Sequence, residues 1–249
     1  MVMSFELEVA LTVLLFIAAA LYTSVGHAGS SAYLAAMGLF GVAPEVMRPT
    51  ALVLNILVSS FTSFRFVTKK LFDWRTLWPF LVGALPMAFV GGAIKLPGEY
   101  YKPLVGIVLW LAAARLLWPN ALKPAESIRP PPIVAAVLIG AGIGLLAGLT
   151  GTGGGIFLSP ILLLRGWAEP RHASGIAAVF ILGNSVFGLA GNAASLGSLA
   201  PQIPVYAVAV MAGAAIGTYF GISRLPVGGI LKALALVLLI AGLKLFGLY

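Results

Sequence analysis

Long apolar runs fill almost the whole chain, and short polar or glycine- and proline-rich stretches separate them. These runs predict ten helical segments, at 7–24, 28–41, 46–67, 76–94, 101–118, 132–149, 154–165, 173–192, 203–220 and 229–247. A transmembrane helix needs about 20 mainly apolar residues, and most of the segments have about that length. The pattern therefore predicts an all-α polytopic membrane protein with little room for a soluble domain.

Two of the segments, those after Gly26 and after Gly151, have only about 13 residues, or roughly 20 Å, against a hydrocarbon core of about 30 Å. Each could cross with help from an extended stretch or turn back as a re-entrant segment. If all ten segments cross from an outside N-terminus, eleven Lys and Arg residues fall inside and four outside. If both short segments turn back and the N-terminus is inside, the division is eight to seven. The positive-inside tendency favours ten crossings with both termini on the outer side, and Arg48 is then expected as an outer interfacial residue.

The chain also has the layout of an internal duplication. The window 26–44 aligns without gaps on the window 151–169, with five identities in nineteen positions. The order long, short, long, long, long recurs in both halves, which predicts a first repeat at 1–118, a linker at 119–131 and a second repeat at 132–249. Because five is an odd number, the second half would enter from the opposite side. The result would be a pair of inverted-topology repeats, typical of secondary transporters.

Composition narrows the class of protein further. Hydrophobic residues make up 61% of the chain and charged residues 9%, against about 25% charged in an ordinary soluble domain, which argues against a soluble enzyme. The chain has no cysteine and only two histidines, His27 and His172, so no disulfide, no metal and no cofactor are expected. The net charge of +8 is interpreted as setting orientation in the lipid bilayer rather than as binding nucleic acid.

Candidate chemistry centres on two glycine-rich breaks, TSVGHAGSS at 23–31 and GLTGTGGGIF at 148–157. The helix N-terminus behind each break offers free N–H groups and the positive end of the helix dipole, and glycine lets an anion approach the backbone. Hydroxyl groups in the breaks add donors without adding charge. The alternative is that the glycines allow tight helix crossings. The candidate anion-binding residues in the breaks are Gly26, His27, Gly29, Ser30, Ser31, Gly151, Thr152, Gly153, Gly154 and Gly155.

The helices that follow the breaks carry further polar candidates. Thr50 and Ser174 lie at comparable positions near the predicted helix starts and would be either N-caps or ligands. Asn55 and Asn184 lie deeper, where the partner is a neighbouring helix, the substrate or a coupling ion. His27 could bind an anion, carry a proton or be a hydrogen-bonded structural residue. All seven acidic residues fall at predicted ends or loops, so no buried carboxylate is expected as a proton relay.

The second break resembles the sulfite exporter TauE/SafE family, also called the TSUP family of anion transporters. The stretch GLTGTGGGIFLSPILLLRGW at 148–167 is similar to the family's GxGGG motif, which a Pro and a run of Leu follow. The matching positions are Gly151, Gly153, Gly154, Gly155 and Pro160. The first break departs from this motif, with GHAGSS and with Ala35 at the position of Pro160. Two further pairs resemble the family's small hydroxyl pair, of which only the first member is kept: Thr50 with Ala51, and Ser174 with Gly175.

The resemblance implies transport of small sulfur-containing or carboxylate anions, such as sulfite and short organosulfonates, as export across a bacterial inner membrane. The residues themselves predict only a small anion in a backbone-rich site. The leading hypothesis is a secondary transporter with alternating access, whose anion binds near the midplane of the lipid bilayer between the two breaks. A proton is a candidate coupling ion, and a homodimer is a candidate assembly. The alternatives are an anion channel and an intramembrane hydrolase that uses His27 with Ser30.

Overall fold

The computed structural model describes residues 4–24, 26–117, 128–222 and 228–247. Over these residues all regular structure is helical, which confirms the all-α expectation. The helices of the first half are α1 (Phe5–Ser24), α2 (Ser30–Leu39), α3 (Pro44–Thr68), α4 (Trp74–Ala93) and α5 (Gly98–Leu117). Those of the second half are α6 (Ile133–Thr150), α7 (Gly155–Leu164), α8 (Pro170–Gly191), the 3₁₀ helix η2 (Ala193–Ser198), α9 (Ile203–Ile222) and α10 (Gly228–Leu245). Each predicted segment corresponds to one of the α-helices.

The lengths of the helices fit a membrane protein with two half-length members. Among the described residues, six helices are long and apolar enough to cross a membrane: α1, α3, α4, α6, α8 and α9. Helices α2 and α7 have ten residues each, which makes them about 15 Å long, or half of the hydrocarbon core. Together with a mean hydropathy of +1.07, these helices define a polytopic membrane protein. The number of crossings and the side of the termini stay predictions.

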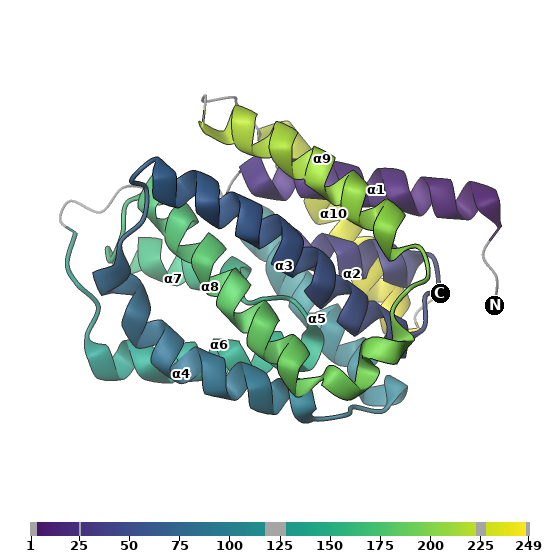
Figure 1. The fold of residues 1–249 in the computed structure, drawn as a ribbon, viewed down its shortest axis with the longest axis horizontal. Helices are drawn as coiled ribbons and strands as arrows, with labels where there is room; N and C mark the ends of the chain where they lie inside the picture. Colours follow the sequence, from purple (N-terminus) through teal and green to yellow (C-terminus); the bar gives the residue numbers. More distant parts are fainter. Residues whose placement is uncertain (1–3, 25, 118–127, 223–227, 248–249) are drawn as a thin grey trace.

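The long helices pack in pairs that join the two halves of the chain. Figure 1 shows α1 beside α9 along one side of the molecule and α4 beside α6 along the opposite side, with α3 and α8 between them. The two pairs are equivalent, because each joins the first helix of one half to the fourth helix of the other half: α1 to α9, and α6 to α4. The third helices, α3 and α8, contact each other, and so do the fifth helices, α5 and α10. The two halves are therefore interlocked.

Glycines bring the backbones of the paired helices into close contact. A Cβ atom at Gly140, Gly144 or Gly148 of α6 would lie 2.2 Å from a carbonyl oxygen of α4. The four-residue spacing places these glycines on one helix face, as in the small-residue crossings of membrane helices. In the same way, a Cβ atom at Gly213 of α9 would lie 2.3 Å from a carbonyl oxygen of α1, and one at Gly217 would lie 2.1 Å from another. Tight helix crossing therefore explains these five glycines of α6 and α9.

The two breaks and their short helices repeat one another at an interval of 125 residues. Helices α2 and α7 begin and end at equivalent positions of this repeat. The backbone is left-handed at three equivalent pairs of glycines, Gly26 and Gly151, Gly29 and Gly154, and Gly41 and Gly166, and the second copy has one more at Gly153. The backbone hydrogen bonds donated by residues 40–42 at the end of α2 recur at 165–167 at the end of α7. This correspondence supports the two-repeat interpretation. The linker at 119–131 stays a prediction, and most of it lies outside the described residues.

Candidate functional site

Glycines in the left-handed backbone region build both breaks. In the first break, Gly26 has φ of +80° and Gly29, the N-cap of α2, has φ of +100°. In the second break, φ is +86° at Gly151, +69° at Gly153 and +79° at Gly154, the N-cap of α7. This region strains other L-residues by about 1–2 kcal/mol, so glycine allows the chain to leave one helix and enter the next. Neither N-cap glycine supplies a side-chain hydrogen bond to the first turn of its helix.

The two breaks touch each other, as the hypothesis of a shared anion site requires. Ser30 Oγ at the start of α2 donates a hydrogen bond to the Thr152 carbonyl oxygen in the second break. His27 Nε2 in the first break lies 3.2 Å from the Gly155 carbonyl oxygen and 3.1 Å from Ser159 Oγ, both on α7. Polar groups of the first half therefore reach the N-terminal end of the short helix of the second half.

The third helix of the opposite half covers each break. A Cβ atom on Gly26 would lie 2.4 Å from Ser174 Cβ, near the start of α8. A Cβ atom on Gly151 would lie 3.2 Å from the Arg48 carbonyl oxygen, near the start of α3. The contact at Gly26 leaves no room for a side chain. Each break is thus held between its own short helix and a long helix of the other half.

Asparagines from α3 and α8 meet at Gly153. Asn184 Nδ2 donates a hydrogen bond of 3.4 Å to the Gly153 carbonyl oxygen, and Asn55 Nδ2 donates one of 3.2 Å to Ser185 Oγ. A Cβ atom on Gly153 would lie 2.6 Å from Asn55 Nδ2 and 3.2 Å from Ser185 Oγ. The side chains of Asn55, Asn184 and Ser185 are fully buried. We call these four residues the Gly153 cluster.

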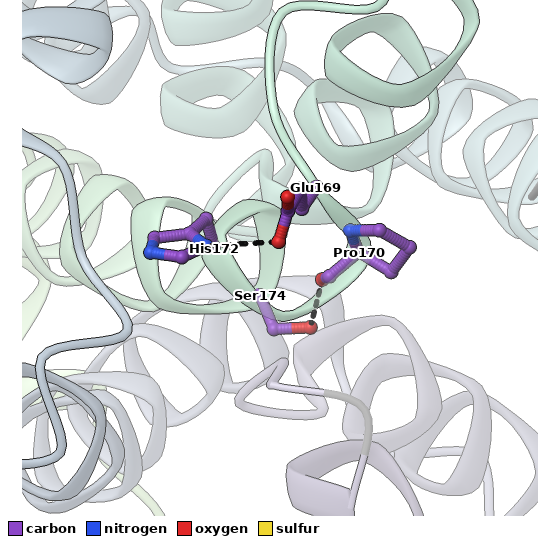
Figure 2. A network of polar contacts seen from close by, with 4 residues as sticks. All are labelled: Glu169, Pro170, His172 and Ser174. Atoms are coloured by element: carbon purple, nitrogen blue, oxygen red, sulfur yellow. Dashed lines mark hydrogen bonds and ion pairs between the residues drawn. The ribbon is translucent and has the colours of Figure 1, made fainter. Parts of the chain in front are cut away.

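Ser174 lies inside the first turns of α8 rather than at the N-cap. The helix begins at Pro170 and its N-cap is Glu169, because proline is favoured at the first helical position. Figure 2 shows Ser174 Oγ donating to the Pro170 carbonyl oxygen at 3.1 Å, and His172 Nδ1 lying 3.8 Å from a carboxylate oxygen of Glu169. The N-cap interpretation of Ser174 is therefore wrong. The backbone and Cβ of Ser174 pack against Gly26 in the first break.

Thr50 and Ser31 are buried with partners in the protein. Helix α3 begins at Pro44, so Thr50 also lies inside its helix and the N-cap interpretation is wrong for it too. Thr50 Oγ1 accepts a hydrogen bond of 3.3 Å from the amide nitrogen of Ala200, in the segment before α9. Ser31 Oγ donates to the hydroxyl oxygen of Tyr22 at 2.7 Å. Both hydroxyl groups hold segments together in the conformation that the structure describes.

Arg48 is a buried capping residue, only 6% exposed, rather than an exposed interfacial one. Its guanidinium group donates hydrogen bonds to the carbonyl oxygens of Gly91, Gly92 and Ile94 at the C-terminal end of α4. A cation is favourable there because the last carbonyls of a helix lack intrahelical partners and carry the negative end of its dipole. The sequence signal was an arginine within an apolar stretch. Arg48 belongs to α3, the helix that covers the second break, and it places a buried positive charge at the C-terminal end of α4.

An all-helical membrane protein in which two broken helices meet inside the bundle has the architecture of a membrane transporter. A family model described as Sulfite exporter TauE/SafE matches residues 11–245. The chain therefore belongs to the sulfite exporter TauE/SafE family, which confirms the resemblance seen in the second break. It is also similar to a protein of Sinorhizobium fredii (strain NBRC 101917 / NGR234) named Probable membrane transporter protein y4hK, with 36% identity over 240 residues, covering 95% of this chain and 97% of the relative. No solved structure matches the chain.

The comparisons support a transporter rather than an enzyme. The hydrolase alternative would need His27 and Ser30 to act together. Instead, Ser30 Oγ donates to the carbonyl oxygen of Thr152, and His27 Nε2 faces Gly155 and Ser159. Both residues are thus used in contacts between the two halves of the chain.

Proposed function

We propose that this protein is an alternating-access carrier that exports a small sulfur-containing oxyanion, such as sulfite or a short organosulfonate, across a bacterial inner membrane. The observation that carries the proposal is the contact between the two glycine breaks, each of which directly precedes a short helix. Membership of the sulfite exporter TauE/SafE family supports the anion class. The name of the Sinorhizobium relative supports membrane transport.

In this proposal the oxyanion binds between the N-terminal ends of α2 and α7. Backbone N–H groups and the positive ends of two helix dipoles stabilise a negative charge there. Hydroxyl groups of Ser30 and Thr152 and the imidazole of His27 lie at the same ends of these helices, with Ser159 one turn further along α7, and these groups can donate hydrogen bonds to anionic oxygens. The proposed binding residues are Gly26, His27, Gly29, Ser30, Gly151, Thr152, Gly153, Gly154 and Gly155.

The contacts between the breaks also suggest how binding leads to movement. Ser30 Oγ and His27 Nε2 are now directed at the carbonyl oxygens of Thr152 and Gly155. A bound oxyanion offers the same donors an ionised acceptor, and hydrogen bonds to ionised acceptors are roughly twice as strong as neutral ones. Exchange of acceptors would loosen two direct links between the halves. Because the halves interlock, the units that could then rock against each other are bundles with helices of both halves, such as the α1–α9 pair and the α4–α6 pair.

Counterflow in proteoliposomes tests this function. Vesicles that contain the purified protein are loaded with unlabelled sulfite and supplied with radiolabelled sulfite outside. A carrier should give saturable exchange, with inhibition by short organosulfonates. Conductance at channel rates without exchange would overturn the carrier proposal and favour the anion channel.

A variant pair connects the flux to the breaks. Ser30→Ala should raise the KM for sulfite about fivefold, because one hydroxyl donor contributes on the order of 1 kcal/mol. Ser195→Ala is the matched control, since Ser195 lies in η2 and its hydroxyl donates to Asn192. An unchanged KM in Ser30→Ala would remove Ser30 from the proposed site.

A further inference from the structure

We infer that the Gly153 cluster (Asn55, Gly153, Asn184 and Ser185) binds a sodium ion that travels with the anion. Binding of Na⁺ is argued from the cluster alone, whereas its role in transport rests on the proposed function. The inference addresses a gap in that function, because the described acidic residues supply no buried proton relay between the breaks.

Two buried amide oxygens in the cluster have no hydrogen-bond partner among the described residues, Asn55 Oδ1 and Asn184 Oδ1. The orientation of the Asn184 amide follows from its contact with Gly153, because a carbonyl oxygen only accepts and the atom facing it at 3.4 Å must be Nδ2. Its Oδ1 is therefore an acceptor without a donor. A buried polar atom without a partner in the protein costs free energy, and native proteins satisfy such atoms with an ordered water, a ligand or an ion.

The chemistry of the cluster suits a small monovalent cation. Asn55 and Asn184 offer amide oxygens, Ser185 offers a hydroxyl oxygen and Gly153 offers a backbone carbonyl oxygen, and such hard oxygen ligands prefer hard cations. All four ligands are neutral. Among the described residues no three His, Cys, Asp or Glu side chains gather as they would around a metal ion of higher charge. Neutral amides do not take up protons at physiological pH, so the cluster does not suit H⁺.

The position of Gly153 in the chain supports the same conclusion. It lies between the C-terminal end of α6, capped at Gly151, and the N-terminal end of α7 at Gly155. The negative end of the α6 dipole favours a cation, and the positive end of the α7 dipole favours an anion. Unwound backbone between half-helices coordinates Na⁺ in other secondary transporters. One break can therefore hold a cation and an anion next to each other, and each ion would partly neutralise the other.

The closing experiment first measures Na⁺ binding without a transported anion. Purified protein in detergent and choline gluconate is titrated with sodium gluconate, and ²²Na⁺ binding and thermal stability are followed, with potassium gluconate as the comparison. We expect saturable ²²Na⁺ binding and a rise in melting temperature that potassium does not reproduce. Absence of saturable Na⁺ binding by the folded wild-type protein would overturn the inference.

Variants of Asn184 locate the ion. Asn184→Leu, which keeps the approximate volume and removes the oxygen, should weaken Na⁺ binding at least tenfold, whereas Asn184→Asp, which keeps an oxygen, should retain it. Asn192→Ala is the control, because Asn192, the C-cap of α8, is also buried but its Oδ1 accepts a hydrogen bond from Ser195. Ser185→Ala serves as the milder test if Asn184→Leu does not fold, and it should weaken binding too. Wild-type affinity in both Asn184→Leu and Ser185→Ala would overturn the assignment to these residues.

Transport then separates the inference from the proposed function. In proteoliposomes, an imposed Na⁺ gradient should drive sulfite movement, and replacement of Na⁺ by choline should slow it at least tenfold. Sulfite movement driven by a pH gradient and unaffected by choline would overturn the coupling and favour the proton. No sulfite movement under any gradient, together with intact ²²Na⁺ binding, would contradict the proposed function and leave the cation site standing.

Discussion

Substitution of Gly26 by alanine tests the close contact between the first break and α8, and Gly41 offers a matched control. Both glycines have a left-handed backbone, with φ of +80° and +71°. A Cβ atom on Gly26 would lie 2.4 Å from Ser174 Cβ and 2.8 Å from Ser174 Cα, whereas one on Gly41 would meet nothing within 4 Å. The two substitutions therefore share the backbone strain and differ in the collision.

The difference can be estimated from its two parts. Left-handed strain costs about 1–2 kcal/mol at either position, and overpacking adds about 1–3 kcal/mol where the neighbouring backbone has to move. Only Gly26→Ala carries the second part, since it meets the backbone of α8. We expect the free energy of unfolding to fall by about 1 kcal/mol in Gly41→Ala and by about 3 kcal/mol in Gly26→Ala. At roughly 3 °C per kcal/mol for a chain of this size, melting temperatures would fall by about 3 °C and about 9 °C.

Thermal unfolding in detergent at one heating rate measures this difference, with a fixed rate because unfolding of such proteins is often irreversible. Sulfite counterflow should slow in Gly26→Ala, whose break is displaced from α8, and stay unchanged in Gly41→Ala. The double variant Gly26→Ala with Ser174→Gly removes the nearest colliding atom and should recover part of the loss. Equal melting temperatures for the two single variants would refute the contact between Gly26 and Ser174.

Three further substitutions test other parts of the structure. Gly144→Leu should abolish the monodisperse folded peak in size-exclusion chromatography, because a Cβ atom there would lie 2.2 Å from a carbonyl oxygen of α4. Gly142→Leu should preserve the peak, because a Cβ atom at Gly142 would meet nothing within 4 Å. Similar elution profiles for the two variants would contradict the α4–α6 packing. Thr50→Val should lower the free energy of unfolding by about 1 kcal/mol through one lost hydrogen bond and leave the sulfite KM unchanged, and a raised KM would instead make Thr50 a ligand. His27→Ala should raise the sulfite KM about tenfold, since one hydrogen bond to an anion is worth about 1.5 kcal/mol, while His172→Ala should not, and equal KM values would exclude His27 from the site.

The positions of the helices could be predicted because the determinant is local. An apolar segment in a bilayer has to satisfy its backbone hydrogen bonds within itself, so each apolar run becomes a helix. The half-length of α2 and α7 followed from the glycine breaks before them. The contact between the breaks was expected from the duplicated layout, since related segments of inverted repeats meet near the axis that relates them.

The partners of individual side chains could not be predicted in the same way. His27 with Ser159 and Asn55 with Ser185 are separated by 132 and 130 positions in the sequence, and only the crossing of helices from opposite halves brings them together. Thr50 was misplaced for a different reason. Its helix begins at Pro44, where proline suits the first turn, and the N-cap is Ala43, so the Thr50 hydroxyl lies about two turns inside the helix and cannot cap it.

The ends of the helices explain how a break without Lys or Arg could hold an anion. Lys244 Nζ donates to the Leu39 carbonyl oxygen at the C-terminal end of α2, so the negative end of this short helix already has a cation. At the positive ends, α3 and α5 carry Glu45 and Glu99 in their first turns, whereas α2 and α7 have no acidic residue there. A negative charge at a helix N-terminus is stabilising whether a side chain or a ligand supplies it. In the proposed site the transported oxyanion takes the place that a first-turn carboxylate holds in α3 and α5, and because it is not attached to the chain, it can leave.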